Sequence, residues 1–209
     1  HPHIVTIYDA GEDRGTAYIA MELLRGQHLV EYASASRLLP TAVAIEIVAR
    51  LADALHYAHQ SQVVHRDIKP ANIMFDAPSG ELKITDFGIA RLTDSGRTRT
   101  GVVLGTPSFM SPEQLQGRPV TGRSDLFSLA VSLYQLLTGQ LPFRGDTMPG
   151  LMMKIALEPH PRICAMHPAL PPGLDAFFDR ALAKDPAARY DSGASFAQAL
   201  RDLNRPDKR

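Results

Sequence analysis

The apolar residues at the start of the chain form short runs, and further along their spacing changes to that of a helix. Residues 4–9 and 16–23 are short runs rich in β-branched and aromatic side chains, and they predict two strands. The glycine-containing segment 11–15 between them predicts a hairpin turn. Apolar side chains at steps of three and four then predict an amphipathic helix over residues 41–60. They are Ala44, Val48, Leu51, Leu55 and Ala58.

Two more strands and a long loop are predicted in the middle of the chain. Residues 73–75 and 82–84 are short extended segments around a Pro-Ser-Gly turn at 78–80. Residues 91–112 are rich in Thr, Arg, Gly and Ser and show no apolar period, which predicts a loop. Loops of this length in compact domains are usually functional or disordered.

The second half of the chain is predicted to be mainly helical. Residues 125–137 are apolar nearly all round, which is typical of a fully buried helix, and Gly139 is suited to end it. Two further amphipathic helices are predicted over 174–184 and 192–203. Strands followed mostly by helices indicate an α+β chain, in which a mostly helical unit carries a two-strand hairpin at its N-terminal edge.

Composition excludes several classes of protein. The 209 residues are 44% hydrophobic, which is enough for one large domain or two small ones with a proper core. Lys plus Arg and Asp plus Glu each number 22, so a net charge of zero gives no general attraction to nucleic acid or to an anionic membrane. A single cysteine, Cys164, excludes an internal disulfide framework and a cysteine-based zinc site. No apolar run approaches the length of a membrane span.

The strongest chemical signal is His-Arg-Asp-Ile-Lys-Pro-Ala-Asn at 65–72, followed by Asp-Phe-Gly at 86–88. A third segment, Gly-Thr-Pro-Ser-Phe-Met-Ser-Pro-Glu, occupies 105–113. With these motifs in this order the chain resembles the protein kinases over essentially its whole length. The resemblance implies a protein-kinase-like fold in which residues 1–24 are a remnant of the N-terminal lobe sheet and hinge. Residues 25–205 are then the C-terminal lobe, with the catalytic loop, the activation loop and a helical subdomain.

The residue types in these motifs match what phosphoryl transfer from ATP requires, namely positioning, neutralisation of charge and a proton acceptor. The resemblance implies that Asp67 accepts the proton and orients the substrate hydroxyl, while Lys69 neutralises the transferred phosphoryl group. Asn72 and Asp86 would supply hard oxygen ligands for Mg²⁺, and Gly88 would allow a tight turn. Taken singly, such residues are more often turn or cap residues, but their combination favours the catalytic interpretation.

Several positions indicate the class of substrate. The resemblance is to Ser/Thr kinases, because Lys69 stands where tyrosine kinases usually carry an Ala-Ala-Arg or Arg-Ala-Ala segment. Thr106 fits this class, since its hydroxyl could hydrogen-bond to Asp67 and Lys69. The segments 111–114 and 180–190 resemble those of the bacterial eukaryotic-like Ser/Thr kinases. We therefore expect protein substrates and a cytoplasmic location, or the cytoplasmic part of a longer membrane-anchored protein.

The resemblance also implies an adenine site at the end of the second predicted strand. Met21 would be the gatekeeper behind the base, and the Glu22 carbonyl and the Leu24 amide would hydrogen-bond to its edge. Met74 would pack beneath the ring from the C-terminal lobe. Backbone contacts leave little trace in a sequence, so a strand end with a core methionine remains the alternative interpretation.

Arg66 directly before Asp67 indicates regulation by phosphorylation. An arginine at this place needs a counter-charge, and a phosphate on Thr98 or Thr100 could supply it, with Arg91 as a second phosphate-binding residue. We expect autophosphorylation at one of these threonines. The alternative is a solvated Thr/Arg loop without a regulatory role.

Other residues are expected to be architectural. The resemblance implies a buried ion pair between Glu113 and Arg189, and an Asp125 side chain that accepts backbone N–H bonds from the catalytic loop. His65 and Phe87 would stack on each other in the core. The remaining histidines show no convincing metal-ligand spacing.

The resemblance begins after the glycine-rich phosphate loop, the strand lysine and the helix glutamate of the family, and no residue here takes those roles. We therefore expect the two N-terminal strands to expose apolar surface and this chain alone to transfer phosphate negligibly. Two other functions are considered, a scaffold that binds without catalysis and a small-molecule phosphotransferase. The intact catalytic residues disfavour the first, and the segment 105–113 disfavours the second, because small molecules need no peptide platform.

Overall fold

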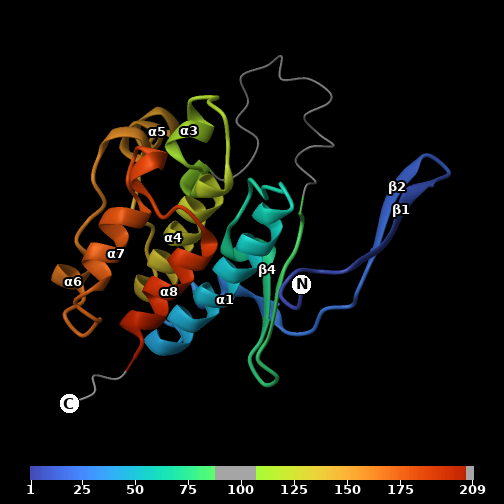
Figure 1. The fold of residues 1–209 in the computed structure, drawn as a ribbon, viewed down its shortest axis with the longest axis horizontal. Coiled ribbons are helices and arrows are strands. Elements are labelled where there is room, and N and C mark those ends of the chain that lie inside the picture. Colours follow the sequence, from blue (N-terminus) through green and yellow to red (C-terminus); the bar gives the residue numbers. More distant parts are fainter. Residues whose placement is uncertain (88–106, 206–209) are drawn as a thin grey trace.

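Three long helices form the centre of the chain in this computed structural model, which describes residues 1–87 and 107–205. Figure 1 shows α1 (Thr41–Gln60), α4 (Gly122–Thr138) and α8 (Gly193–Leu203) side by side. The helix predicted over 41–60 is thus confirmed. Its apolar residues at steps of three and four are buried against the other two helices, which fixes the hydrophobic core in this part of the chain.

The helix predicted to be fully buried, α4, is buried on nearly every side. Its polar side chains do not oppose this, because Ser128, Ser132 and Thr138 each donate their hydroxyl to the backbone carbonyl four residues earlier. The helix begins before residue 125, since Thr121 caps its first turn. It ends where predicted, at Gly139, which has a left-handed φ of 73°.

Shorter helices surround this centre. They are α3 (Pro112–Leu115), α5 (Met148–Leu157), α6 (Ile163–Met166) and α7 (Leu174–Ala181), with 3₁₀ turns at Leu29–Tyr32, Pro70–Asn72, Pro107–Phe109 and Pro186–Ala188. The sequence did not locate α5, because Pro149 and Gly150 in its first turn hide the helical period, although Pro is well placed there. The helix predicted over 174–184 is shorter than expected and ends at Ala181. None of the helices in the described ranges is long and apolar enough to cross a membrane.

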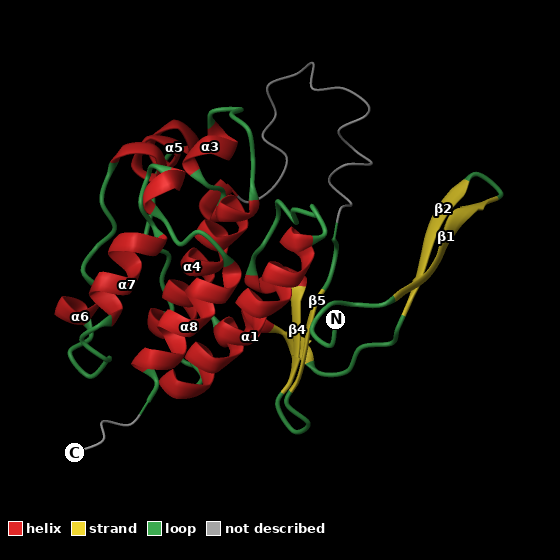
Figure 2. Cartoon of the chain, viewed as in Figure 1, coloured by secondary structure: helices red, strands yellow, loops and turns green. Residues whose placement is uncertain are grey.

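A three-stranded antiparallel sheet lies at one side of the helices (Figure 2). Its order is β3 (Gln27–His28), β4 (Ile73–Asp76) and β5 (Glu81–Ile84), which confirms the two strands predicted in the middle of the chain. Arg50 on α1 donates a hydrogen bond to the Gly80 carbonyl in the β4–β5 turn and so connects the sheet to the helices.

The predicted N-terminal hairpin is present, but the bounds of its first strand and its turn differ from the prediction. Its strands are β1 (Ile7–Asp13) and β2 (Thr16–Met21), so the strand predicted over 4–9 and the turn predicted over 11–15 are wrong. The turn consists of Arg14 and Gly15 alone, both with positive φ, as a tight hairpin turn requires. Ile4 and its neighbours lie instead beside β5, where Ile4 bridges to Ile84.

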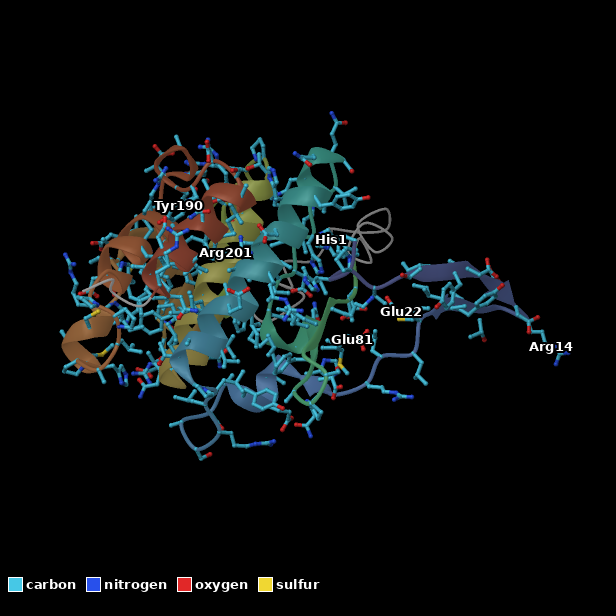
Figure 3. The ribbon with its side chains drawn as sticks, turned by 60° about the horizontal axis from the view of Figure 1, so that its bottom comes forward. His1, Arg14, Glu22, Glu81, Tyr190 and Arg201 are labelled. Atoms are coloured by element: carbon cyan, nitrogen blue, oxygen red, sulfur yellow. The ribbon has the colours of Figure 1, made fainter. Side chains whose placement is uncertain are left out.

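The hairpin projects away from the rest of the molecule. Figure 3 shows Arg14 at its far tip and Glu22 where the hairpin joins the body. Every residue of both strands is exposed, and the apolar members include Ile7, Tyr8 and Tyr18. The expectation that these strands expose apolar surface is therefore confirmed.

The end of α4 provides a test of backbone strain against packing. We expect Gly139→Ala to lower the free energy of unfolding by about 2–4 kcal/mol. Alanine would have to adopt the left-handed backbone conformation of Gly139, and its Cβ would also lie 2.6 Å from the Ala35 backbone nitrogen. Gly117→Ala is the matched control, since Gly117 has a φ of 63° but open space around it, and it should cost only about 1–2 kcal/mol. Chemical denaturation measures both, and equal losses would contradict the packing argument.

Candidate active site

Asp125 on α4 holds the segment that contains the first motif. Its Oδ2 accepts the backbone N–H of His65 at 2.9 Å, and its Oδ1 accepts that of Arg66 at 2.8 Å. The carboxylate is 1% exposed, so these bonds form away from water. The predicted role of Asp125 is confirmed. His59 was not predicted to take part, yet its Nε2 lies 2.8 Å from Asp125 Oδ2.

The backbone is strained on both sides of the site. Arg66 has a φ of 71° and Asp86 a φ of 62°, which non-glycine residues rarely adopt. Such conformations cluster at functional sites and persist where the surroundings fix them. Here Asp125 fixes the amide of Arg66, and the Gln114 side chain donates a hydrogen bond to its carbonyl at 2.8 Å.

The structure brings Asp67, Lys69 and Asn72 together. Lys69 Nζ lies 2.7 Å from Asp67 Oδ2, and Asn72 Nδ2 donates to the same oxygen at 2.9 Å. Asn72 Nδ2 also donates to the Asp67 backbone carbonyl at 2.9 Å. The Asp67 side chain is 45% exposed, so a carboxylate with a fixed orientation remains accessible to a substrate.

Thr85 connects Asn72 to Asp86. The Thr85 backbone N–H and hydroxyl both donate to the Asn72 carbonyl, at 2.9 and 3.1 Å, and Asp86 follows directly in the chain. Asn72 is 7% exposed, whereas Asp86 is exposed. Because Asn72 turns its amide nitrogen to Asp67, its amide oxygen is the atom left to bind a ligand. An amide oxygen and a carboxylate form a donor set that fits Mg²⁺.

His65 is buried beneath the same segment and connects it to β5. Its Nδ1 accepts the Asp67 backbone N–H at 3.2 Å, so the proton resides on Nε2, which donates to the Thr85 carbonyl at 2.8 Å. The ring meets Phe87 edge-on with centroids 4.5 Å apart. His65 and Phe87 are thus in contact as predicted, but edge to face rather than stacked, and Phe87 is only partly buried.

The ion pair predicted between Glu113 and Arg189 is present and bidentate. The two guanidinium nitrogens each lie 2.8 Å from one carboxylate oxygen of Glu113, and Arg189 is 2% exposed. The remaining N–H groups of Arg189 donate to backbone carbonyls of Ala183, Lys184 and Arg123, so all of its donors are satisfied. Burial opposes ionisation of Glu113, but hydrogen bonds from Arg189 and Ser124 outweigh it and keep the pKa of Glu113 below its usual value.

The residues predicted to surround adenine lie at the junction between the hairpin and the sheet. Met74 pairs with Lys83 across β4 and β5, and Lys83 Nζ lies 2.7 Å from the Glu22 carboxylate. The hydrogen bond from Lys83, and next to it one from the Thr6 backbone N–H, lower the pKa of Glu22. Met21 ends β2 and is 40% exposed, and Leu24 is half-buried. The pair of Glu22 with Lys83 was missed, because 61 residues separate its members and no motif marks them.

Five residues of the predicted site and its regulation lie outside the described ranges. They are Gly88, Arg91, Thr98, Thr100 and Thr106.

The comparisons decide the family. Residues 1–202 match the protein kinase domain. The chain belongs to the protein kinase family. Its relatives include the serine/threonine-protein kinase PrkC of Bacillus subtilis, 40% identical over 193 residues, and PknB of Mycobacterium tuberculosis, 41% identical over 207 residues. These alignments cover 92% and 96% of this kinase chain, but only 30% and 33% of the relatives.

Solved structures of kinases share the fold. The kinase domain of PknI from Mycobacterium tuberculosis gives a TM-score of 0.76 at 32% identity, over 97% of this chain and 73% of that one. Rad53 1–466 in complex with AMP-PNP gives 0.79 at 28% identity, over 96% of this chain and 50% of that one. The predicted α+β kinase-like fold is thereby confirmed.

The ion pair of Glu113 and Arg189 should contribute strongly to stability. We expect Arg189→Met to lower the free energy of unfolding by about 3–5 kcal/mol, because it leaves the Glu113 carboxylate buried without its partner. Arg201→Met is the control, because it breaks a partly exposed pair with Asp53, in which water reaches both side chains, and should cost about 0–1 kcal/mol. Denaturant titration measures both losses in the free energy of unfolding, and equal losses would show that the buried pair contributes no more than the partly exposed one.

A half-buried lysine beside this pair makes the free energy of unfolding depend on pH in the alkaline range. Lys184 Nζ donates to the Ile155 carbonyl in the last turn of α5 at 2.7 Å and lies 3.9 Å from the Phe143 ring centroid. Burial lowers the pKa of Lys184 to about 8, with Arg189 adding to the effect.

Between pH 8 and 10.5 the folded chain therefore binds fewer protons at Lys184 than the unfolded chain, so this residue makes stability rise with pH. We expect the stability of the wild type relative to Lys184→Met to increase from pH 7 to pH 10. Urea unfolding at both pH values measures it, and a constant difference would refute the argument.

Proposed function

We propose that this chain is the catalytic part of a Ser/Thr protein kinase, which transfers the γ-phosphoryl group of ATP to Ser and Thr hydroxyls of proteins. The observation that supports this best is the Asp67 carboxylate, half-exposed and held by Lys69 and Asn72 on a segment that Asp125 fixes. Chemistry that depends on positioning needs this combination of access and fixed orientation. The kinase relatives of bacteria agree with the proposal.

In the proposed reaction Asp67 orients the attacking hydroxyl and accepts its proton. Lys69, which is paired with Asp67, neutralises negative charge on the transferred group. Asn72 and Asp86 would hold Mg²⁺, which when bound neutralises the charge of the phosphates. The Thr85 hydrogen bonds to Asn72 support this assignment, because they keep the two metal-binding residues adjacent.

The adenine of ATP is proposed to bind at the junction between hairpin and sheet. Met21 would stand behind the base, the Glu22 carbonyl and Leu24 amide would hydrogen-bond to its edge, and Met74 would lie beneath it. The pair of Lys83 with Glu22 supports this location, because it fixes the backbone that would carry the two hydrogen-bonding groups. Rad53, a structural neighbour, binds the ATP analogue AMP-PNP.

Regulation through the segment after Asp86 is also proposed. A phosphate on Thr98 or Thr100, added by the kinase itself, would be bound by Arg66 and Arg91. Arg66 is half-buried next to Asp67, so a phosphate there would act close to the catalytic carboxylate. A cytoplasmic location of the chain remains a prediction from its sequence and resemblance.

The test compares two Asp→Asn variants in an assay that transfers labelled phosphate from Mg-ATP to a generic Ser/Thr protein. The assay uses this chain together with a glycine-rich loop, a strand lysine and a helix glutamate of the family, because phosphoryl transfer by protein kinases needs these groups. We expect Asp67→Asn to reduce the rate by about 10²–10⁴-fold, since it removes the proton acceptor. Asp76→Asn, at the end of β4, should leave the rate unchanged, because among the described residues the Asp76 carboxylate is hydrogen-bonded only to the Ser79 hydroxyl.

Three outcomes would contradict the proposal. Full activity of Asp67→Asn would exclude Asp67 as the catalytic residue. Phosphorylation of an aminoglycoside but of no protein would instead identify a small-molecule phosphotransferase, and nucleotide binding without any transfer would identify a scaffold.

A further inference from the structure

A cavity of about 560 Å³ lies where the end of α1 meets the starts of α4 and α8. Its size is within the range of sites that bind small molecules. Nine residues line it, and most of them are polar. His56, His59 and Gln60 come from α1, Thr121 and Arg123 from the start of α4, and Asp191 and Ser192 from the start of α8. The proposed phosphotransfer uses none of them.

The chemistry of the wall favours an anion over a cation. Arg123 and His56 offer N–H donors. One guanidinium nitrogen of Arg123 donates to the Pro186 carbonyl at 2.9 Å, and His56 Nε2 accepts from the Gln60 amide nitrogen at 3.2 Å, which leaves the His56 proton on Nδ1. The Nε2 of His59 is already bound to Asp125. The one carboxylate in the wall, Asp191, already accepts hydrogen bonds from the Ser192 and Ser195 hydroxyls. No group of three or more His, Cys, Asp or Glu residues in the described ranges is placed to hold a metal ion.

Two glycines keep the walls of the cavity close to α1. A Cβ at Gly122 would lie 2.5 Å from Nδ1 of His59, and a Cβ at Gly193 would overlap the Ala52 carbonyl. The starts of α4 and α8 therefore approach α1 more closely than they could if positions 122 and 193 held any residue other than glycine. The His59 ring is held between Gly122 on one side and Asp125 at its Nε2.

His59 connects this cavity to the catalytic segment, residues 65–72, which carries Asp67. Its ring lines the cavity, and its Nε2 lies 2.8 Å from the same Asp125 oxygen that accepts the His65 amide. The other oxygen of Asp125 accepts the Arg66 amide, one residue before Asp67. A ligand that moves the His59 ring therefore acts on the catalytic segment through two hydrogen-bonded residues, His59 and Asp125.

We propose that this cavity binds a small molecule carrying a phosphate monoester or inorganic phosphate, and that its occupancy alters the catalytic segment through His59 and Asp125. Arg123 and His56 donate to the phosphate oxygens, and His59 transmits the binding. This inference does not depend on the proposed phosphotransfer, because the site and the path are defined by residues outside the reaction.

The test follows the histidine ring signals by NMR in the 209-residue chain labelled with ¹³C-histidine and ¹⁵N. Inorganic phosphate and glycerol 3-phosphate are titrated separately at constant ionic strength, with chloride as the reference. We expect saturable shifts of His56 and His59, but not of His160, which lies beside Asp179. The anion that saturates at the lower concentration identifies the source of the phosphate group.

Variants test the site and the path separately. Arg123→Gln and His56→Gln should each weaken phosphate binding, Arg123→Gln by about tenfold or more, because a charged hydrogen bond is lost. Arg144→Gln, which lines a different cavity, should not change it. In the wild type the Arg66 amide signal should move with the same saturation curve, and in His59→Gln it should no longer respond while binding persists.

Three results would overturn the proposal. The first is a shift that grows linearly without saturation or is equal with chloride. The second is unchanged binding in both Arg123→Gln and His56→Gln while the chain remains folded. The third, an Arg66 amide that does not respond in the wild type, would refute the path from the cavity to the catalytic segment.

Discussion

Asp125 joins α4, the most buried long helix in the described ranges, to the segment that carries the Asp67 carboxylate, for which we propose a catalytic role. Its two oxygens accept the amides of His65 and Arg66, and this holds Arg66 in a left-handed conformation that it would rarely adopt alone. The backbone directly before Asp67 is fixed in this way, and the Asp67 carboxylate itself is bonded to Lys69 and Asn72. The rigidity of α4, which comes from its burial, is therefore passed to a half-exposed group.

A second buried carboxylate has a comparable role on the other side of the site. Glu113 is held by Arg189 and Ser124, and the following residue, Gln114, donates to the Arg66 carbonyl. The Arg66 peptide is thus held at its nitrogen by Asp125 and at its carbonyl by Gln114. The Asp125 bond derives its strength from burial and charge, because hydrogen bonds to a buried charged group are least weakened by water, whereas the Gln114 bond joins two neutral, partly buried groups.

Sequence reasoning succeeded where a pattern is local and failed where contacts are distant. The period of α1, the burial of α4 and the pair of Glu113 with Arg189 followed from spacing or from the kinase resemblance. The bounds of the first hairpin strand were wrong, because the β-branched residues at 4–6 lie beside β5, about 80 residues later in the chain. Neither the role of His59 nor that of Lys83 could be predicted, since each depends on a partner that only the fold brings near.

The serine hydroxyls of α4 have unequal freedom to vary during evolution. Ser128 and Ser132 donate to carbonyls of their own helix, so their neighbours require nothing from them, and alanine would fill nearly the same volume. The Ser124 hydroxyl instead donates to Glu113, on a different helix, at 2.6 Å. Related sequences are therefore free to exchange serine and alanine in the middle of this helix, whereas its first turn is bound to a chemical group elsewhere in the fold.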